Sequence, residues 1–368
     1  MKFRTSNEDL LRGLSTVTRV LSARTTQPIL EGVLLQTGDN DLLLTCSDGN
    51  MSIVTRVSAQ IEENGAVVLP GRLFLDIVRK MPSGELKAAV NSQSVLSLKS
   101  GSVRMTLSGQ DARFYPPLPI LSAENSVELS QSVLHDMIQQ TSFAIASESS
   151  HRVLTGAFLE ISEGEMCIVC LDGYRLALSK QRIADSSVQL KAIIPMKAVQ
   201  EIGRILEEDE EKTATLQIGG TQMMMTLGVT TVYSTLIDGE YTNYRAILPS
   251  VYKTQICIGR ESMQHCVERA SLIAREGKNN LLKMQISPDE LVITSNSETG
   301  EIYEKQEVEV VGDDLSIAFN VLYVSDVLRV LPDDEAYMRF NSPVSPCVVC
   351  PVSGDSYLYL ILPVRVNA

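Results

Sequence analysis

The sequence contains no tryptophan, and aromatic residues make up only 5% of its 368 residues. A surface that stacks single-stranded bases needs aromatic side chains, so this composition argues against such a surface. No apolar run approaches the roughly 18–20 residues that a membrane-spanning helix needs. The opening segment, MKFRTSNEDLLRGLS, has no apolar stretch followed by a cleavage site. We therefore expect a folded cytoplasmic protein.

The motifs of common enzymes are also missing. The sequence has no G-x-x-x-x-G-K-[ST] phosphate-binding loop, no G-x-G-x-x-G after a strand and no G-x-S-x-G nucleophile turn. Its three histidines, His135, His151 and His265, do not stand at metal-binding spacing. The sequence therefore gives no positive indication of catalysis, and we expect a non-catalytic protein without metal or cofactor.

Two C-x-x-C pairs, Cys167/Cys170 and Cys347/Cys350, are the only residues that resemble a zinc site. The residues between them, Ile-Val and Val-Val, favour an extended strand, on which positions i and i+3 face opposite sides. Two such sulfurs cannot chelate one ion, so we expect buried thiols. A zinc protein remains an alternative that metal analysis would decide.

An internal repeat is the most informative feature of the chain. Each third contains a helix-like segment, two strand-like runs, a second helix and further strands, and Arg72, Lys197 and Leu322 mark the second helices at steps of 125 residues. In the first helix, Leu10, Leu14, Val17 and Leu21 fall on one face at helical spacing. The pattern predicts an α+β fold of three tandem similar domains, each with two helices packed on antiparallel sheets. The predicted domains cover residues 1–125, 126–250 and 251–368.

The charge is unevenly distributed. The chain has 32 Lys and Arg against 45 Asp and Glu, a net charge of −13, which is unfavourable for binding a polyphosphate. The six predicted helical windows, by contrast, hold 13 Lys and Arg and nine Asp and Glu. An acidic protein can still hold nucleic acid if its cations share one surface. The six windows cover residues 7–24, 70–82, 131–146, 195–205, 260–278 and 320–331.

Four motifs in order complete the pattern: LDGYRLALSK at 171–180, IDGEYTNYRAILP at 237–249, IAFNVLYVSDVL at 317–328 and LILPVRV at 360–366. Together with the three repeats, they resemble the bacterial DNA sliding clamp family, the beta subunit of DNA polymerase III, over essentially the whole chain. The resemblance implies that two chains close head-to-tail into a ring around duplex DNA, with helices lining the hole. The resemblance further implies that this homodimer tethers the polymerase by topology and binds DNA independently of sequence.

The resemblance also implies three sets of site residues. DNA-approaching positions are Arg24, Arg72, Arg152 and Lys197. At the interface between chains, Arg104, Met105 and Leu107 would meet Leu272 and Ile273. A pocket would bind a short peptide, with a Gln and hydrophobic anchors, from the polymerase III alpha subunit, the clamp loader, and other polymerases and repair proteins. Its matching positions are Leu154, Leu171, Gly173, Tyr174, Arg175, Leu176, Thr242, Ile247, Asn320, Tyr323, Val344, Pro346, Ile361, Leu362, Pro363, Val364 and Arg365.

A second function class stays open at this point. A monomeric three-domain protein-binding scaffold without a DNA role would have the same repeats, and each apolar pocket position taken singly suits an ordinary core. The mass of the protein in solution separates this alternative from a ring.

Overall fold

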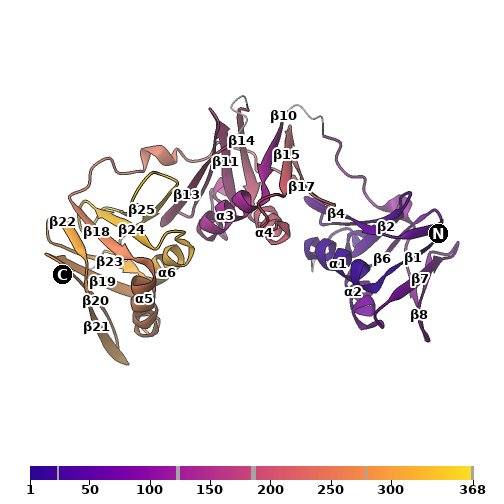
Figure 1. Ribbon diagram of the computed structural model, residues 1–368, viewed down its shortest axis with the longest axis horizontal. Coiled ribbons are helices and arrows are strands. Elements are labelled where there is room, and N and C mark those ends of the chain that lie inside the picture. Colours follow the sequence, from indigo (N-terminus) through magenta and orange to yellow (C-terminus); the bar gives the residue numbers. More distant parts are fainter. Residues whose placement is uncertain (23–24, 122–124, 184–187, 278–279, 366–368) are drawn as a thin grey trace. The chain divides into compact units, whose positions relative to one another are not determined.

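A computed structural model describes residues 1–22, 25–121, 125–183, 188–277 and 280–365 of the chain (Figure 1). This described part contains six α-helices and 26 β-strands, with short 3-10 helices between them. None of the described helices is long and apolar enough to cross a membrane. The α+β class agrees with the prediction.

The helices occur two to a repeat. They are α1 (Asn7–Val17), α2 (Gly71–Lys80), α3 (Gln131–Thr141), α4 (Met196–Ile205), α5 (Arg260–Ala274) and α6 (Val321–Val330). Helices α2, α4 and α6 begin at equal steps of 125 residues, which confirms the repeat.

Side-chain caps fix where two of these helices begin. The Ser6 hydroxyl accepts the Asp9 N–H at 3.3 Å before α1, and the Asn320 side chain accepts the Leu322 N–H at 3.0 Å before α6. Helix α1 ends at Val17, short of the predicted window, and continues only as the 3-10 turn η1 (Thr18–Val20).

The strands form four sheets in which every pairing is antiparallel. In pairing order, the first sheet is β5 (Gln60–Glu63), β1 (Lys2–Ser6), β7 (Glu85–Val90), β8 (Val95–Ser100) and β9 (Val103–Ser108). The second is β10 (Asn125–Ser130), β15 (Thr213–Gly219), β16 (Gln222–Leu227), β17 (Thr230–Thr235), β4 (Met51–Ser58), β3 (Asp41–Ser47), β2 (Gly32–Thr37) and β6 (Ala66–Pro70). The third is β14 (Leu190–Pro195), β11 (Gly156–Ser162), β12 (Glu165–Leu171), β13 (Arg175–Arg182), β26 (Tyr357–Ile361), β25 (Cys347–Pro351), β24 (Glu335–Phe340), β18 (Thr254–Gly259) and β22 (Glu309–Gly312). The fourth is β21 (Gly300–Glu307), β20 (Glu290–Ser297), β19 (Leu281–Ser287) and β23 (Leu315–Asn320).

These sheets contain two four-stranded units per repeat, with β5 and β22 as additional edge strands. One unit has the order β6-β2-β3-β4, which recurs as β14-β11-β12-β13 and as β23-β19-β20-β21. The other has the order β1-β7-β8-β9, which recurs as β10-β15-β16-β17 and as β18-β24-β25-β26. Each repeat therefore has the same topology, as the sequence pattern predicts.

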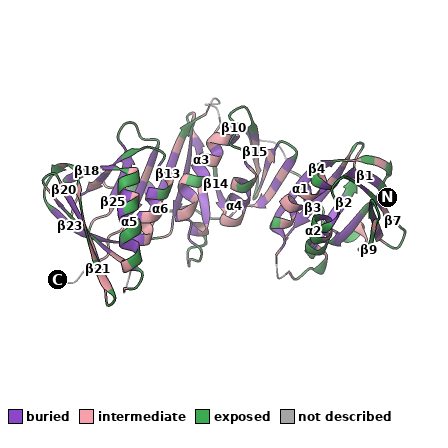
Figure 2. Cartoon of the chain, turned by 60° about the horizontal axis from the view of Figure 1, so that its bottom comes forward, coloured by how far each residue is buried: buried purple, intermediate pink, exposed green. Residues whose placement is uncertain are grey.

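Neighbouring repeats join through the last strands of these units. Strand β17 pairs with β4, and the hydroxyls of Thr55 and Thr230 lie 2.8 Å apart across that junction. Strand β26 pairs with β13 in the same way, so two sheets run on from one repeat into the next. Within the described chain, the equivalent strands β9 and β21 each end a sheet (Figure 2). One junction of this kind is therefore left open at each end of the repeat series.

The chain divides into two compact units, Met1–Leu134 with Gln200–Leu236 and His135–Val199 with Ile237–Ala368. In the first, α1 packs on β3 and β4 beside α2, and Leu10, Leu14, Val17 and Leu21 are all buried, as predicted. In the second, α5 packs on β20 beside α6. In both units, strands and helices carry buried residues (Figure 2).

Candidate functional site

The turn between β12 and β13 presents an aromatic side chain to solvent. Asp172 accepts the backbone N–H groups of Tyr174 and Arg175 at 2.9 and 3.0 Å through one carboxylate oxygen, which closes an Asx-type turn. Gly173 has φ +92°, a conformation that side chains disfavour. The result is a tight turn from which Tyr174 projects with 61% of its surface exposed.

An aromatic pair continues from this turn onto α6. The rings of Tyr174 and Tyr323 lie nearly parallel with centroids 6.1 Å apart. Burial raises the pKa of the Tyr323 hydroxyl, so Tyr323 stays neutral at physiological pH. The two rings form one wall of the predicted pocket, from segments some 150 residues apart in the sequence.

The last described residues run beside this wall. The Leu362 N–H donates to the Tyr174 carbonyl at 2.9 Å, and the Val364 N–H donates to the Ala318 carbonyl at 2.8 Å. These bonds hold residues 362–365 against both the β12–β13 turn and the end of β23. The described part of the last motif therefore lies beside the DGYR turn and beside Ala318 at the end of β23.

The remaining pocket positions divide into core and surface. Leu154, Leu171, Leu176 and Ile361 are buried, and the first three belong to one cluster against which Leu362 packs. Ile247 is 42% exposed and Val344 is 65% exposed, and neither is needed to fill the core. The exposed or half-buried positions are Gly173, Thr242, Asn320, Pro346, Pro363, Val364 and Arg365. The predicted pocket positions thus divide into apolar residues that are part of the core and accessible residues beside them.

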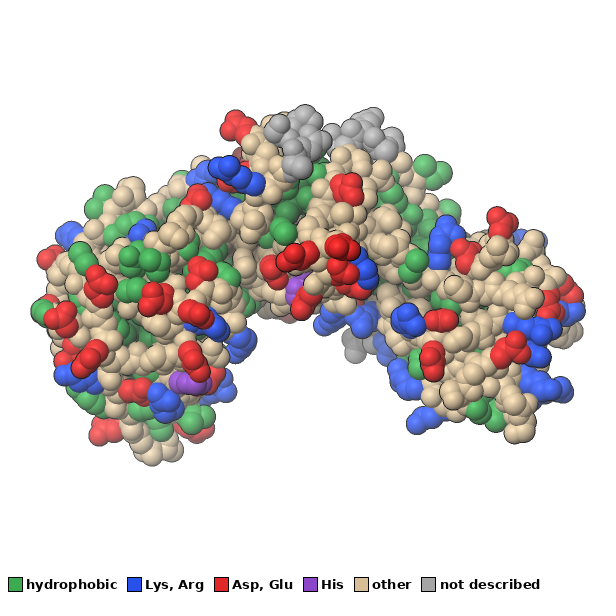
Figure 3. Space-filling model, in the orientation of Figure 1, with side chains coloured by type: hydrophobic (Ala, Val, Ile, Leu, Met, Phe, Trp, Pro, Cys, Tyr) green, Lys and Arg blue, Asp and Glu red, His purple; other side chains and the backbone are tan. Residues whose placement is uncertain are grey.

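The predicted DNA-approaching cations lie on several helical segments. Arg72 is exposed on α2 and donates to the Leu21 carbonyl at 3.3 Å. Arg152 is exposed in the 3-10 turn η5 (Arg152–Thr155), and Lys197 is half-buried in α4. Arg24 lies outside the described residues. Lys and Arg side chains gather over α1 and α2 in Figure 3.

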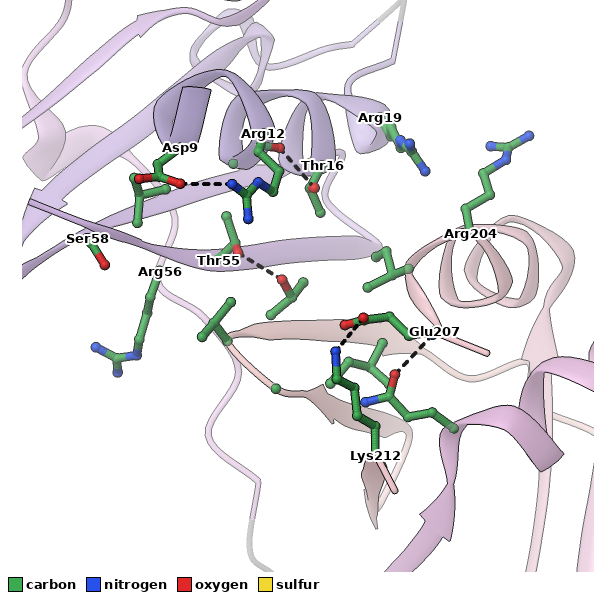
Figure 4. A pocket seen from close by; sticks show the side chains of 18 of the residues that line it. Asp9, Arg12, Thr16, Arg19, Thr55, Arg56, Ser58, Arg204, Glu207 and Lys212 are labelled. Atoms are coloured by element: carbon green, nitrogen blue, oxygen red, sulfur yellow. Dashed lines mark hydrogen bonds and ion pairs between the residues drawn. The ribbon is translucent and has the colours of Figure 1, made fainter. Parts of the chain in front are cut away.

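A cavity of about 680 Å³ in the first compact unit is lined by five cations, Arg12, Arg19, Arg56, Arg204 and Lys212 (Figure 4). Two acids, Asp9 and Glu207, also line this cavity and pair with Arg12 and Lys212. Arg19 has no ion-pair partner among the described residues, and Arg204, which pairs with Glu201, lies at the same end of the cavity (Figure 4). The charge count over helical windows included both arginines, but only the fold brings them together.

Both cysteine pairs lie in strands, β12 and β25, as predicted. Burial raises the pKa of Cys167 to about 11 and that of Cys170 to about 12. Metal binding requires the thiolate, and these thiols stay protonated at neutral pH. Among the described residues, no group of three or more His, Cys, Asp or Glu side chains is arranged to hold a metal ion.

The predicted interface residues lie on the edge strand β9 and on helix α5, which packs beside the edge strand β21. On β9, Met105 pairs with Leu98 and shares its core-facing side, whereas Arg104 pairs with Lys99 and points to the opposite, solvent-facing side. Leu272 is 67% exposed on α5. Helix α5 lies against β21, where Arg269 pairs with Glu304.

Comparisons with known proteins agree with this geometry over the full length of the chain. Family models described as the N-terminal, central and C-terminal domains of the DNA polymerase III beta subunit match residues 1–119, 128–243 and 245–365. Proteins named beta sliding clamp from Staphylococcus epidermidis and Staphylococcus aureus are each 33% identical over 375 residues, with 99% of both chains covered.

Solved structures give the same result. The Bacillus subtilis DNA polymerase sliding clamp matches with a TM-score of 0.96 at 30% identity, covering 100% of both chains. A Pseudomonas aeruginosa sliding clamp bound to griselimycin matches with a TM-score of 0.94 at 29% identity, again covering 100% of both chains. The chain therefore belongs to the DNA polymerase III beta subunit family, the non-catalytic sliding clamps of bacterial DNA replication.

Proposed function

We propose that two copies of this chain close head-to-tail into a ring around duplex DNA through β9 of one copy and β21 of the other. The observation that carries this proposal is the repeated junction. Strand β4 pairs with β17 and β13 pairs with β26, and β9 and β21 are the equivalent strands whose second edge has no pairing within the described chain. Rings that encircle DNA are a property of this family. A closed head-to-tail assembly leaves no such edge exposed to aggregation.

The existing junction also gives a register for the proposed one. Ser52 is the second residue of β4 as Glu301 is the second residue of β21, and Tyr233 is the fourth residue of β17 as Thr106 is the fourth residue of β9. Because Ser52 pairs with Tyr233, Glu301 is expected opposite Thr106 of the second copy. In the same register, Arg104 of one copy lies opposite Tyr303 of the other, on the solvent-facing side of both strands.

The apolar interface residues fit the other side of this pairing. Met105 and Leu107 share the core-facing side of β9, and α5, which carries Leu272 and Ile273, packs on the corresponding side of β21. Burial of exposed Leu272 and Met105 against each other would favour closure. Arg104, which the resemblance groups with these residues, would instead meet solvent-facing side chains of β21.

We further propose that the pocket in the second compact unit binds short peptides of the polymerase III alpha subunit, the clamp loader and other polymerases and repair proteins. Family members bind the polymerase and clamp loader. The support is an apolar floor next to an accessible rim with aromatic anchors, an arrangement that suits a few hydrophobic side chains and a polar group. Tyr174, Ile247 and Val344 supply the exposed apolar surface.

Contact with DNA is proposed to be weak and independent of sequence, through Arg24, Arg72, Arg152 and Lys197. Cations that contact phosphates position the duplex without reading bases. The cavity between α1 and the end of α4 adds Arg19 and Arg204 to this proposal. Tight phosphate contacts would slow sliding, so scattered cations suit a tether whose grip is topological.

The domains are proposed to cover residues 1–125, 126–250 and 251–368, and the protein to act in the cytoplasm, where the chromosome is replicated. The mass in solution tests ring formation against the monomeric scaffold. Sedimentation at micromolar concentration is expected to give twice the 40.4 kDa of one chain. A single-chain mass at that concentration would favour the scaffold and remove the ring.

A further inference from the structure

We propose that Asp326 is a positioning residue of the peptide pocket, which acts through Arg175 to hold the Tyr174–Tyr323 wall and does not itself touch the peptide. This inference rests on the proposed peptide-binding function. The resemblance assigns Arg175 to the pocket and assigns no role to Asp326.

The side chain of Arg175 is already committed to the protein at each of its three nitrogens. Its Nη1 donates to Asp326 Oδ2 at 2.5 Å, its Nε to Asp172 Oδ2 at 3.0 Å and its Nη2 to the Phe143 carbonyl at 2.8 Å. Only 12% of the side chain is exposed. A peptide would have to displace one of these acceptors to reach the guanidinium.

Aromatic rings occupy the space around the same guanidinium. Its central carbon lies 4.7 Å from the ring centre of Tyr323 and 5.2 Å from that of Phe143, within the range of cation–π attraction. Arg175 therefore orients Tyr323 directly.

Arg175 also supports Tyr174, through Asp172. One oxygen of Asp172 accepts from Arg175 Nε, while the other accepts the backbone N–H of Tyr174. The carboxylate of Asp326, 151 residues further along the chain than Arg175, thus anchors the guanidinium that orients both tyrosines. A wall held in this way before binding reduces the ordering cost that the peptide interaction must offset.

The test compares Asp326→Ala with a matched control, Arg329→Ala. Arg329 Nη1 donates to the other oxygen of Asp326 at 3.3 Å and is itself exposed, so removing it leaves the Arg175 contact intact. The full-length protein is titrated against a short fluorescein-labelled peptide that carries one Gln with Leu and Phe anchors. A second peptide has the Gln replaced by Ala.

Asp326→Ala is expected to weaken binding of both peptides by the same factor, about tenfold, because two side chains must then be ordered on binding. Arg329→Ala is expected to leave both affinities unchanged. Arg175→Lys is a second variant, which keeps the charge but cannot reach three acceptors at once, and it is expected to weaken both peptides equally. If Asp326→Ala weakened binding of the Gln peptide but not of the Ala peptide, Asp326 would contact the peptide directly. That result would overturn the positioning role.

A measurement on the peptide-free protein separates this inference from the peptide-binding function. With 3-fluorotyrosine incorporated, the fluorine resonances of Tyr174 and Tyr323, assigned with Phe variants, are expected to shift in Asp326→Ala and to stay in place in Arg329→Ala. Unchanged resonances in Asp326→Ala would overturn the inference even if peptides bind. If the unaltered protein binds neither peptide, the proposed function fails while the fluorine result still decides whether Asp326 holds the wall.

Discussion

A cysteine pair at Thr106 and Glu301 is predicted to link two copies of the chain by disulfides, because the proposed β9–β21 register sets these residues opposite each other. Both side chains are exposed and lie on the solvent-facing side of their strands. The register is transferred from the pairing of Ser52 with Tyr233 at the β4–β17 junction.

The distances decide which pairs can react. The Cα atoms of directly opposite residues of antiparallel strands lie about 4.5–5.5 Å apart, and a residue two positions further along lies about 7–8 Å away. A disulfide joins residues whose Cα atoms are about 4.4–6.8 Å apart. Thr106→Cys with Glu301→Cys falls within this range, whereas Thr106→Cys with Tyr303→Cys is diagonal and falls outside it.

The assay is a non-reducing gel after mild oxidation, read for a species of twice the 40.4 kDa chain mass. The matched pair should cross-link nearly fully, and the diagonal pair and the unaltered protein should not. Six of the seven native cysteines are buried, and Cys257 is half-buried, so background linkage should be low. Cross-linking of the diagonal pair in preference to the matched pair would refute the register, and failure of both in a dimeric sample would refute the β9–β21 junction.

Four further results are expected. Leu154→Ala should lower the free energy of unfolding, measured with urea, by about 2–5 kcal/mol because the side chain is buried in the core. Ile247→Ala should instead weaken peptide binding with little change in stability. Glu160 is buried, which raises its pKa, but hydrogen bonds from two cations outweigh burial and lower the pKa overall. Its carboxylate therefore contributes stability above the unfolded-state pKa, and this is lost as pH falls through the folded pKa, so urea midpoints of Glu160→Gln and the unaltered protein should converge in acid. Arg19→Ala with Arg204→Ala should reduce the slope of log affinity for short linear DNA against log salt by about 1.8.

The repeat made much of the fold predictable from the sequence. The second helices start at a constant step along the chain, and Leu10, Leu14 and Val17 fall on one face of the first helix. The structure matches both signals. Strand assignment of the C-x-x-C pairs followed from their β-branched residues. Helix α1 ends at Val17, earlier than its apolar pattern implies, and the chain continues as a 3-10 turn. The spacing of buried residues does not distinguish an α-helical turn from a 3-10 turn.

Features that depend on pairing between residues far apart in the chain could not be predicted from the sequence. The joining of β4 to β17 brings together residues about 175 positions apart, as the Thr55–Thr230 contact shows. The sequence likewise has no signal that pairs Arg175 with Asp326, or that brings Arg19 and Arg204 to one cavity. The resemblance implies a set of pocket positions, but only the structure places Leu154 within a core cluster, which makes Leu154 a poor probe of peptide binding alone.

The most direct test of the central claim is retention on DNA of defined topology. The protein is loaded onto a nicked circular plasmid by a clamp loader, washed at high salt, and the circle is then cut once with a restriction enzyme. Topological binding predicts that the protein stays on the circle and leaves after linearisation. Equal retention on circular and linear DNA would show that ordinary contacts hold it and would contradict the ring.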